Sequence, residues 1–398
     1  MKSKIALFLS FFCACGQFNA HANDAIEFSG YARIIAGYFD QENVEYDGYD
    51  NSINFSPDSL IGLQLDYELN EYFALTGQVK LTDSRVSEDD SSGLEWLYLT
   101  YQPTDNIQMK LGKLRTPFFA MSDFSDVGFA YPWINLPQQV YNTYLFDTFN
   151  GIDVIYKFSG KNFDASIESY YGYKNGVTEV GNIKSGLEVD NLVGVIGKLN
   201  VSNLEFRAAK YSGDASLDFS DLKEMEFQLR ELGFTQSADT LSTKGQAEAE
   251  QLSILFDNLN YFFRAEWIRI TTDFEVIPSA DNYYLTGGFN LGAITYHLTY
   301  GNSDVTSGST INEIPTGVSD DLDKLNNAYQ EIFRSSTPDE LESWTLGVRW
   351  DVRTNIALKA EVSTLKGNDG VNSFFSSSDS QNFDKKGNLY LLGLEWVF

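Results

Sequence analysis

Cysteine is almost absent from this chain of 398 residues, which contains only Cys13 and Cys15. Both lie in residues 1–22, where a basic start, a short apolar stretch and small residues at the end are typical of a secretory signal peptide. We therefore expect the mature chain to comprise residues 23–398 and to contain no cysteine. Disulfides, cysteine metal ligands and cysteine nucleophiles are then excluded. A lipoprotein signal that ends at Cys15 is the alternative.

Basic residues and histidines are also scarce. The sequence has 28 Lys and Arg against 56 Asp and Glu, which gives a formal net charge of −28. So acidic a chain lacks the basic footprint that nucleic acids require, and we expect no nucleic-acid partner. One of the two histidines lies in the leader, which leaves His297 as the candidate base, and no serine-nucleophile, phosphate-loop, dinucleotide or zinc motif accompanies it. The sequence therefore predicts neither an enzyme nor a cofactor or metal site.

Long apolar runs are missing from the mature chain, where none reaches the roughly 18 residues that a transmembrane helix needs. Because hydrocarbon cannot satisfy free backbone N–H and C=O groups, a membrane protein without such helices must be a closed β-barrel. The 23 Tyr, 30 Phe and 31 Gly fit a barrel, since aromatic side chains band both membrane interfaces. A large soluble β-protein is the alternative, and the pattern along the chain has to decide.

The last ten residues show that pattern most clearly. Every second residue counted back from Phe398 is apolar, beginning with Trp396 and Leu394, whereas Glu395 lies on the opposite face. Alternation over about ten residues is typical of a transmembrane β-strand. A terminal Phe that closes such a strand resembles the signal that outer-membrane proteins present to the barrel-assembly machinery, which we therefore expect as a partner.

Sixteen segments with this alternation follow one another along the mature chain. Seven tight links rich in Asn, Gly, Pro or Asp alternate with eight longer links, among them residues 116–149 and 174–190. The fold predicted is all-β: a sixteen-stranded antiparallel transmembrane barrel with short periplasmic turns and long extracellular loops. The segments begin near Ile26, Ser59, Tyr72, Gly93, Asn106, Asn150, Asn162, Asn191, Asn203, Ala249, Asn260, Asp281, Ala293, Ser343, Asn355 and Gly387.

Two of the long loops contain apolar residues at helical spacing. We expect short surface helices, each packed on its own loop, rather than sites for a protein partner. The helical positions are Leu222, Met225, Leu229 and Leu232 in the fifth loop, and Leu322, Leu325 and Tyr329 in the seventh. Two acidic runs also lie in loops, and we expect them to be solvated, because neither has calcium-loop spacing; divalent-cation binding is the alternative. These runs are Glu88, Asp89 and Asp90, and Asp320, Asp321 and Asp323.

The third long loop, Arg115 to Phe149, is unusually apolar for an external segment and contains seven aromatic residues between Phe118 and Tyr141. Such a loop would be poorly placed in open water. We expect it to fold into the lumen, where its aromatic side chains pack against the wall and its acids Asp123 and Asp126 face the water-filled path.

The alternation also assigns basic residues to the inner face of the barrel. Cations opposite the two loop acids would create a transverse field at the narrowest point, which favours polar solutes. Ordinary hydrated or cross-strand-paired charges are the alternative. The predicted constriction comprises Arg33, Lys80, Lys110, Arg115, Asp123 and Asp126, and the other predicted lumen cations are Arg207, Arg264, Arg349 and Lys359.

A signal peptide, sixteen amphipathic strands, a long third loop and a terminal Phe together resemble the general diffusion porins of Gram-negative bacteria. That resemblance implies a homotrimer whose third loop folds inward, with loop acids facing a basic cluster on the wall. The usual Pro-Glu-Phe-Gly-Gly motif of that loop is absent here. Gly128 and Phe129, with the acids Asp123 and Asp126, are a loose substitute.

The function predicted is a passive aqueous channel in the outer membrane for small hydrophilic solutes and ions. The surrounding partners would be outer-membrane lipid and lipopolysaccharide, and the surplus of loop acids gives a weak preference for cations. The alternatives are a substrate-selective porin for small anions or organic acids, and a loop-borne adhesin.

Overall fold

A computed structural model provides the structure of the chain. It describes residues 25–82, 92–143, 146–180, 183–275, 279–306, 310–335, 340–367, 374–377 and 383–398. The expected signal peptide and the acidic run of residues 88–90 lie outside these residues.

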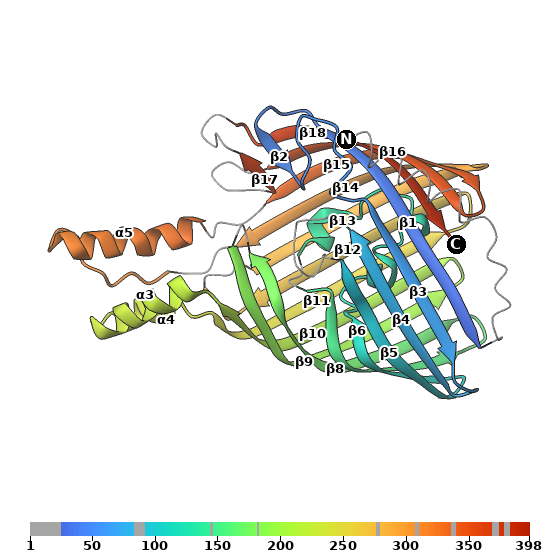
Figure 1. Ribbon diagram of the computed structural model, residues 1–398, viewed down its shortest axis with the longest axis horizontal. Coiled ribbons are helices and arrows are strands. Elements are labelled where there is room, and N and C mark those ends of the chain that lie inside the picture. The colour runs from blue at the N-terminus through green and yellow to red at the C-terminus, as the bar shows by residue number, and fades with distance from the viewer. Residues whose placement is uncertain are drawn as a thin grey trace, which may run out of the picture.

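Sixteen strands form a closed antiparallel barrel, as the alternation of the sequence predicts, in which each strand pairs with its neighbours along the chain (Figure 1). The barrel closes where β1 pairs with β18, with Tyr31 opposite Val397 and Phe39 opposite Leu389. The strands are β1 (Ile26–Phe39), β3 (Leu60–Glu68), β4 (Phe73–Thr82), β5 (Gly93–Thr104), β6 (Ile107–Arg115), β7 (Thr148–Ser159), β8 (Asp164–Val180), β9 (Ile183–Val201), β10 (Leu204–Asp218), β11 (Lys244–Asp257), β12 (Tyr261–Thr272), β13 (Ser279–Leu291), β14 (Ile294–Thr306), β15 (Leu341–Arg353), β16 (Ile356–Gly367) and β18 (Lys386–Val397).

Along each strand apolar and polar side chains alternate between the outside and the inside of the barrel. On β16, for example, Leu358 is 40% exposed on the outside, whereas its neighbours Ala357 and Lys359 are buried inside. The same period of two on β15 exposes Trp344 and Leu346. This is the inverse of a soluble β-protein, which turns its large apolar side chains inward.

Most strands begin within two residues of the predicted positions, but β9 and β11 do not. β9 starts at Ile183 rather than near Asn191, and β11 starts at Lys244 rather than near Ala249. The link predicted over residues 174–190 is therefore wrong, because β8 and β9 continue as a hairpin and pair as far as Val180 and Ile183. A register shift between Gly172 and Lys174 interrupts the alternation, which is why the sequence pattern ends too early there.

Two short strands at the loop end of the barrel join its first and eighth loops. β2 (Val44–Tyr46) pairs with β17 (Phe375–Ser377) in a two-stranded sheet, and the Phe39 and Tyr46 rings stack at 5.9 Å. This sheet was not predicted, since three residues are too few to show a period of two.

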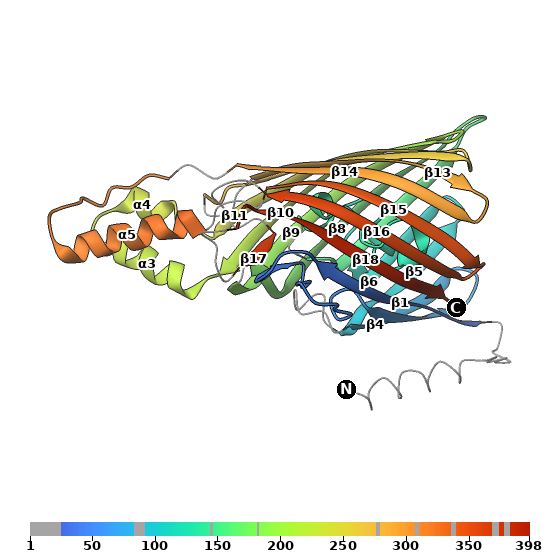
Figure 2. The same ribbon diagram turned by 90° about the horizontal axis from the view of Figure 1, so that it is seen from above.

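The helices predicted in the fifth and seventh loops are present and project together beyond the loop end of the barrel (Figure 2). They are α3 (Ser220–Glu231) in the fifth loop and α5 (Asp320–Ser335) in the seventh, and the fifth loop also contains α4 (Thr235–Asp239), which was not predicted. The acids Asp320, Asp321 and Asp323 occupy the first turn of α5. Among the described residues no helix is both long and apolar enough to cross a bilayer.

These helices pack across two loops, not each on its own loop as expected. Leu229, Ala238 and Tyr329 are buried in one apolar cluster that includes residues of both loops. The Glu313 carboxylate of the seventh loop accepts hydrogen bonds from the backbone N–H groups of Gln236 at 2.7 Å and Ser237 at 3.2 Å, at the start of α4. The apolar face of each helix was visible in the sequence, but the loop against which it packs was not.

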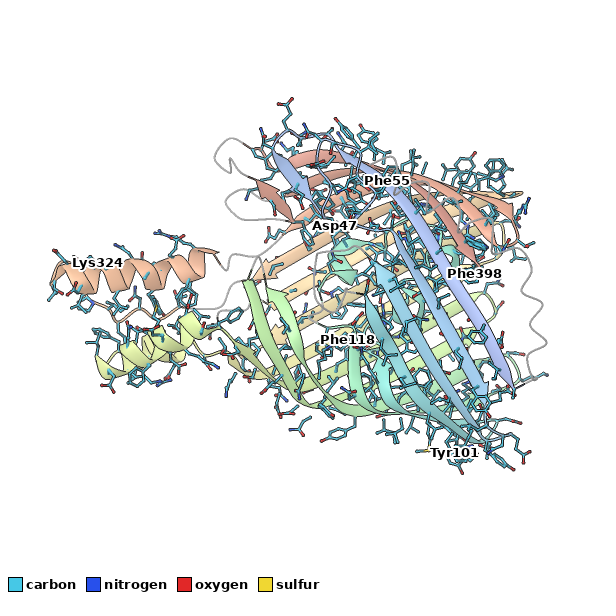
Figure 3. All side chains as sticks on the ribbon, in the orientation of Figure 1. Asp47, Phe55, Tyr101, Phe118, Lys324 and Phe398 are labelled. Carbon is cyan, nitrogen blue, oxygen red and sulfur yellow. The ribbon has the colours of Figure 1, made fainter. Side chains whose placement is uncertain are left out.

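The described part of the third loop, residues 116–143 and 146–147, folds inside the barrel and contains three short helices. They are η1 (Ser122–Phe124), η2 (Gly128–Ala130) and α2 (Gln138–Tyr141). The segment contacts strands on widely separated parts of the wall, since α2 packs on β12 to β14 and η2 packs on β18. In Figure 3 the label of Phe118 lies within the outline of the barrel, whereas Lys324 lies on the projecting α5.

Candidate pore constriction

The part of the third loop that lies inside the barrel is called the inserted segment below. It is held first by its aromatic side chains. Tyr131, Trp133 and Ile134 are each at most 1% exposed, so they are fully enclosed between the loop and the wall. The Trp133 indole N–H donates a hydrogen bond of 2.8 Å to Thr299 on β14, and the Trp133 ring packs edge-on against Tyr284 of β13. Burying this much apolar surface in the lumen explains why an external loop is rich in Phe, Tyr and Trp.

Three wall cations hold the backbone of residues 128–134. Lys359 Nζ donates to the carbonyl oxygens of Gly128, Tyr131 and Trp133 at 2.7, 2.8 and 2.6 Å. Arg349 donates to the carbonyl oxygens of Phe129 at 2.6 Å and Tyr131 at 3.0 Å. These hydrogen bonds help to satisfy carbonyl groups of irregular buried backbone, among which Gly128 also accepts from the Tyr131 backbone N–H at 3.2 Å.

Arg33 completes this cluster from the other side of the barrel seam. It donates to the Ile134 carbonyl oxygen at 2.6 Å, and its Nε lies 3.9 Å from Glu395 on β18. Glu395 is 1% exposed and also pairs with Lys359 at 2.6 Å, so one carboxylate balances two cations. Arg33, Arg349 and Lys359 were predicted to face the lumen, and in the structure they contact the third loop rather than an open path.

The first residues of the segment are anchored on the opposite side, by β10 and β12. Arg207 donates to the carbonyl oxygen of Pro117 and to the Tyr211 hydroxyl. The Glu266 carboxylate accepts from the Ala120 backbone N–H at 2.8 Å and from the Tyr141 hydroxyl at 2.8 Å. The loop is therefore fixed to both halves of the wall and crosses the lumen between them.

A compact ion cluster joins the loop acid Asp126 to β4, β5 and β6. Asp126 lies 3.0 Å from Arg115 and 3.5 Å from Lys80, and Arg115 also lies 2.7 Å from Glu95 and 3.3 Å from Asp147. Burial opposes ionisation of Asp126, but the charges of Lys80 and Arg115 prevail and lower the pKa of its carboxyl to about 2. Three of the six predicted constriction residues, Lys80, Arg115 and Asp126, thus meet in one cluster, in which cation and carboxylate are in contact.

Asp123 is the most exposed of the predicted residues, whereas Lys110 is partly exposed, as are Arg115, Asp126, Arg264 and Arg349. Asp123 is exposed on η1 although it lies inside the barrel, and Lys110 on β6 is partly exposed over the Tyr98 ring at 5.5 Å. Lys110 is directly opposite Asp153 of β7 in the strand register. Glu168 of β8 lies nearby and is 3.9 Å from Lys198 of β9.

Arg264, the last of the predicted lumen cations, packs on aromatic rings. Its guanidinium carbon lies 5.3 Å from the Trp133 ring centre and 5.8 Å from that of Phe262. A cation stacked in this way is retained without a carboxylate partner.

The carboxylates that complete these clusters were not among the residues predicted for the constriction. The alternation of the sequence places Glu266 and Glu395 on the inner face of the barrel. It does not show that they bind the third loop and the wall cations. Glu95 carries no such signal, because a register shift between Gln78 and Val79 of the neighbouring strand disturbs the alternation beside it.

Comparison with known proteins identifies the architecture. No protein-family model matches the sequence, and no curated protein matches it. Among solved structures, OmpT of Vibrio cholerae is 13% identical with a TM-score of 0.51, over 94% of this chain and 99% of that chain. Another structure of that protein, 14% identical over the same shares with a TM-score of 0.50, is described as a trimer form.

Two further solved structures have a TM-score of 0.54 over 94% of this chain. They are OmpF of Salmonella typhi, in complex with daunomycin, which is 10% identical over 97% of its length, and an anion-selective porin of Comamonas acidovorans, 11% identical over 99%. At such identities the likeness shows a common fold. The chain has the fold of the Gram-negative outer-membrane porins.

Proposed function

We propose that the chain is an outer-membrane porin, a passive aqueous channel for small hydrophilic solutes and ions. The observation that carries this proposal is a closed barrel that is apolar outside and polar inside, crossed by a segment that is braced to the wall from both sides. A segment fixed in this way narrows the lumen to a set width, as a size-selective pore requires.

The proposed path runs between the inserted segment and the wall of β6 to β9. On the opposite side Lys359, Arg33 and Arg349 are engaged with the loop, whereas Asp123 is exposed towards Lys110. In this proposal the narrowest part is lined by Asp123 of the loop and by Lys110 and Asp153 of the wall.

The charges on that path favour cations. Asp123, Asp153 and Glu168 lie there beside Lys110 and Lys198, whereas the third nearby cation, Arg207, is bound to the loop backbone and to Tyr211. We infer a moderate cation preference, because a surplus of fixed negative charge in a narrow path raises the local concentration of cations. Selectivity for small anions is the second candidate, which the similarity in fold to an anion-selective porin brings forward. The engagement of the wall cations with the loop speaks against it.

Catalysis is not part of the proposal. His297, the candidate base, is 2% exposed, lies 3.3 Å from Glu361 and is covered by the Trp133 ring. A substrate has no access to it. An adhesin built on the projecting helices of the fifth and seventh loops is less favoured, because in the described residues Leu229 and Tyr329 of these helices are buried in one shared apolar cluster.

The proposal extends to the surroundings of the barrel. We propose residues 1–22 as a cleaved signal peptide, lipid and lipopolysaccharide around the outer wall, and assembly through the final strand that ends at Phe398. A homotrimer is proposed as well, supported by the trimer form described for OmpT of Vibrio cholerae, which shares the fold.

Solute uptake into proteoliposomes tests this function. Vesicles that contain the refolded protein are placed in isotonic solutions of neutral sugars of increasing size, and swelling is followed by light scattering. The proposal predicts fast swelling with monosaccharides and a steep fall for oligosaccharides. Swelling no faster than in protein-free vesicles would refute it. Equal rates for every size would refute the inserted segment as the constriction.

A further inference from the structure

Three charged side chains on the proposed path act on one another without forming an ion pair. They are Lys110 of β6, Asp153 of β7 and Asp123 of the inserted segment. Both carboxylates act on the charge of Lys110. Nevertheless, in the part of the chain that the structure describes, no carboxylate lies within 4.0 Å of the Lys110 ammonium group. That group lies over the Tyr98 ring instead, 5.5 Å from the ring centre.

Two other sets of opposite charges inside the barrel are in direct contact. Arg115 lies 2.7 Å from Glu95 and 3.0 Å from Asp126, and Lys359 lies 2.6 Å from Glu395. Contact of this kind compensates the burial of charges. Because Lys110 and its two acids do not meet in this way, both signs of charge stay available to a solute on the path.

Asp153 shows a second sign of an unfilled site. Its side chain is 6% exposed, and its Oδ1 atom has no hydrogen-bond partner among the described residues. Tyr170 is directly opposite Asp153 on β8, and its buried hydroxyl group has no partner there either. Buried polar atoms without a partner are rare in proteins, and such atoms often mark a place where a ligand or water binds. Because Lys110 is opposite Asp153 in the register of β6 and β7, these oxygen atoms accompany the unpaired cation.

The neighbouring charges are already engaged. Glu168 lies 3.9 Å from Lys198, and Arg207 donates to the carbonyl oxygen of Pro117 and to the Tyr211 hydroxyl. Glu168, Lys110, Asp123 and Lys198 are the charged groups that act on Asp153. Of these, Lys110 and Asp123 are the two that form no ion pair with a described residue.

We propose that Lys110, Asp123 and Asp153 form a binding site for small zwitterionic solutes, of which free α-amino acids are the simplest. The solute carboxylate accepts hydrogen bonds from the Lys110 ammonium group, and the solute ammonium group donates to Asp123 and to Oδ1 of Asp153. A zwitterion of this kind carries both charges on one carbon atom, so it bridges a cation and acids that do not reach each other. An ion of one sign would leave one side of the site unpaired.

Such a site changes the rate at which the channel passes solutes. A channel has to attract its solute and also release it, so the binding is weak. We expect half-saturation of zwitterion flux at about 1–10 mM. Below that range a zwitterion enters faster than a neutral solute of equal size, and above it the flux levels off. The inference rests on the proposed function, because it places the site on the proposed path.

Uptake of four radiolabelled solutes of equal size into proteoliposomes tests the site. The solutes are alanine, lactate, alaninamide and lactamide, which at pH 7 are a zwitterion, an anion, a cation and a neutral molecule with the same carbon skeleton. KCl is present on both sides of the membrane, so that no potential builds up. At low concentration the proposal predicts alanine uptake at least threefold faster than lactamide uptake, and faster than that of either ion. Alanine uptake should saturate, whereas lactamide uptake should stay proportional to concentration.

Substitutions separate the two halves of the site. Lys110→Met removes the group that binds the solute carboxylate, so the ratio of alanine to lactamide uptake should fall to about one, whereas the ratio of alaninamide to lactamide uptake should not fall. Asp123→Asn should lower both ratios. Lys366→Met is the matched control for the lysine, because Lys366 is exposed on β16 beside Glu342, and it should leave both ratios as they are.

The outcomes that overturn the site differ from the one that overturns the channel. Equal uptake of alanine and lactamide would remove the site and leave the channel. Alaninamide that enters as fast as alanine would indicate a plain cation site, and an alanine ratio that survives Lys110→Met would exclude the role of Lys110. Uptake of none of the four solutes would refute the proposed function, and the site with it.

Discussion

Replacing Lys359 with Met removes the cation that holds the centre of the inserted segment. In the structure its side chain is fully buried, and its ammonium group contacts three loop carbonyl oxygens and Glu395, all within 2.8 Å. Met has nearly the same length but no donor. The substitution therefore leaves Glu395 buried with only Arg33 nearby, at 3.9 Å, and it leaves three carbonyl groups without this donor.

The expected effect is large. Breaking a buried ion pair by removing one partner costs about 3–5 kcal/mol, and each buried polar group left unpaired costs about 1–3 kcal/mol. The barrel ladders do not depend on Lys359, so the segment relieves this cost by leaving the wall while the barrel persists. We expect residues 128–134 to bind the wall less tightly by at least 3 kcal/mol. This shifts the equilibrium between the bound and the released segment by more than a hundredfold.

Single-channel recording in planar bilayers measures this directly. Lys359→Met should give a higher and noisier conductance than the unaltered protein. Lys366→Met on the same strand, whose ammonium group is exposed and 3.2 Å from Glu342, should change nothing. Adding Glu395→Gln to Lys359→Met should bring the conductance and the current noise part of the way back to those of the unaltered protein, because it removes the uncompensated charge. A Lys359→Met channel with unaltered conductance and noise would refute the role given to this cluster.

Three other predictions concern the path, the ion cluster and the loop helices. Asp123→Asn should reduce the cation preference measured by reversal potential in a KCl gradient, whereas Asp320→Asn, on a distant loop, should not; equal shifts would contradict the proposed path. The lowered pKa of Asp126 means that its ion pairs stabilise the protein fully above about pH 4 and lose that contribution as the pH falls towards 2. Asp126→Asn should therefore lower the melting temperature at pH 6 but hardly at pH 2, and a constant difference would count against the pairing. Glu313→Ala, which removes the acceptor at the start of α4, should speed proteolysis in the fifth loop severalfold without altering conductance, and an unchanged rate would exclude the contact between the two loops.

The barrel was predictable because its strands obey a short local rule. A period of two and a tight turn are properties of ten to fifteen neighbouring residues. Each strand, such as Ile294 to Thr306, can therefore be recognised from its own sequence. The rule fails where a bulge intervenes, as at Gly172 before the extended hairpin of β8 and β9. It also fails for β2 and β17, which pair across more than 300 residues and are three residues long.

The candidate site was predictable only in part, for a physical reason. The alternation along the strands predicts that Lys359 and Arg33 face the inside of the barrel. It does not predict which groups they contact there. Their partners are backbone carbonyl groups of the third loop, which every residue carries and which leave no trace in the sequence. Asp123 and Asp126 look alike in the sequence, and only the fold separates the exposed acid from the paired one.

Stepwise ion current through a planar bilayer tests the central claim, that a water-filled path crosses the barrel beside its inserted segment. The account predicts discrete, ohmic conductance steps when the purified protein is added, with a reversal potential that indicates a moderate preference for K⁺ over Cl⁻. A correctly folded, membrane-inserted protein that passes no current would contradict it.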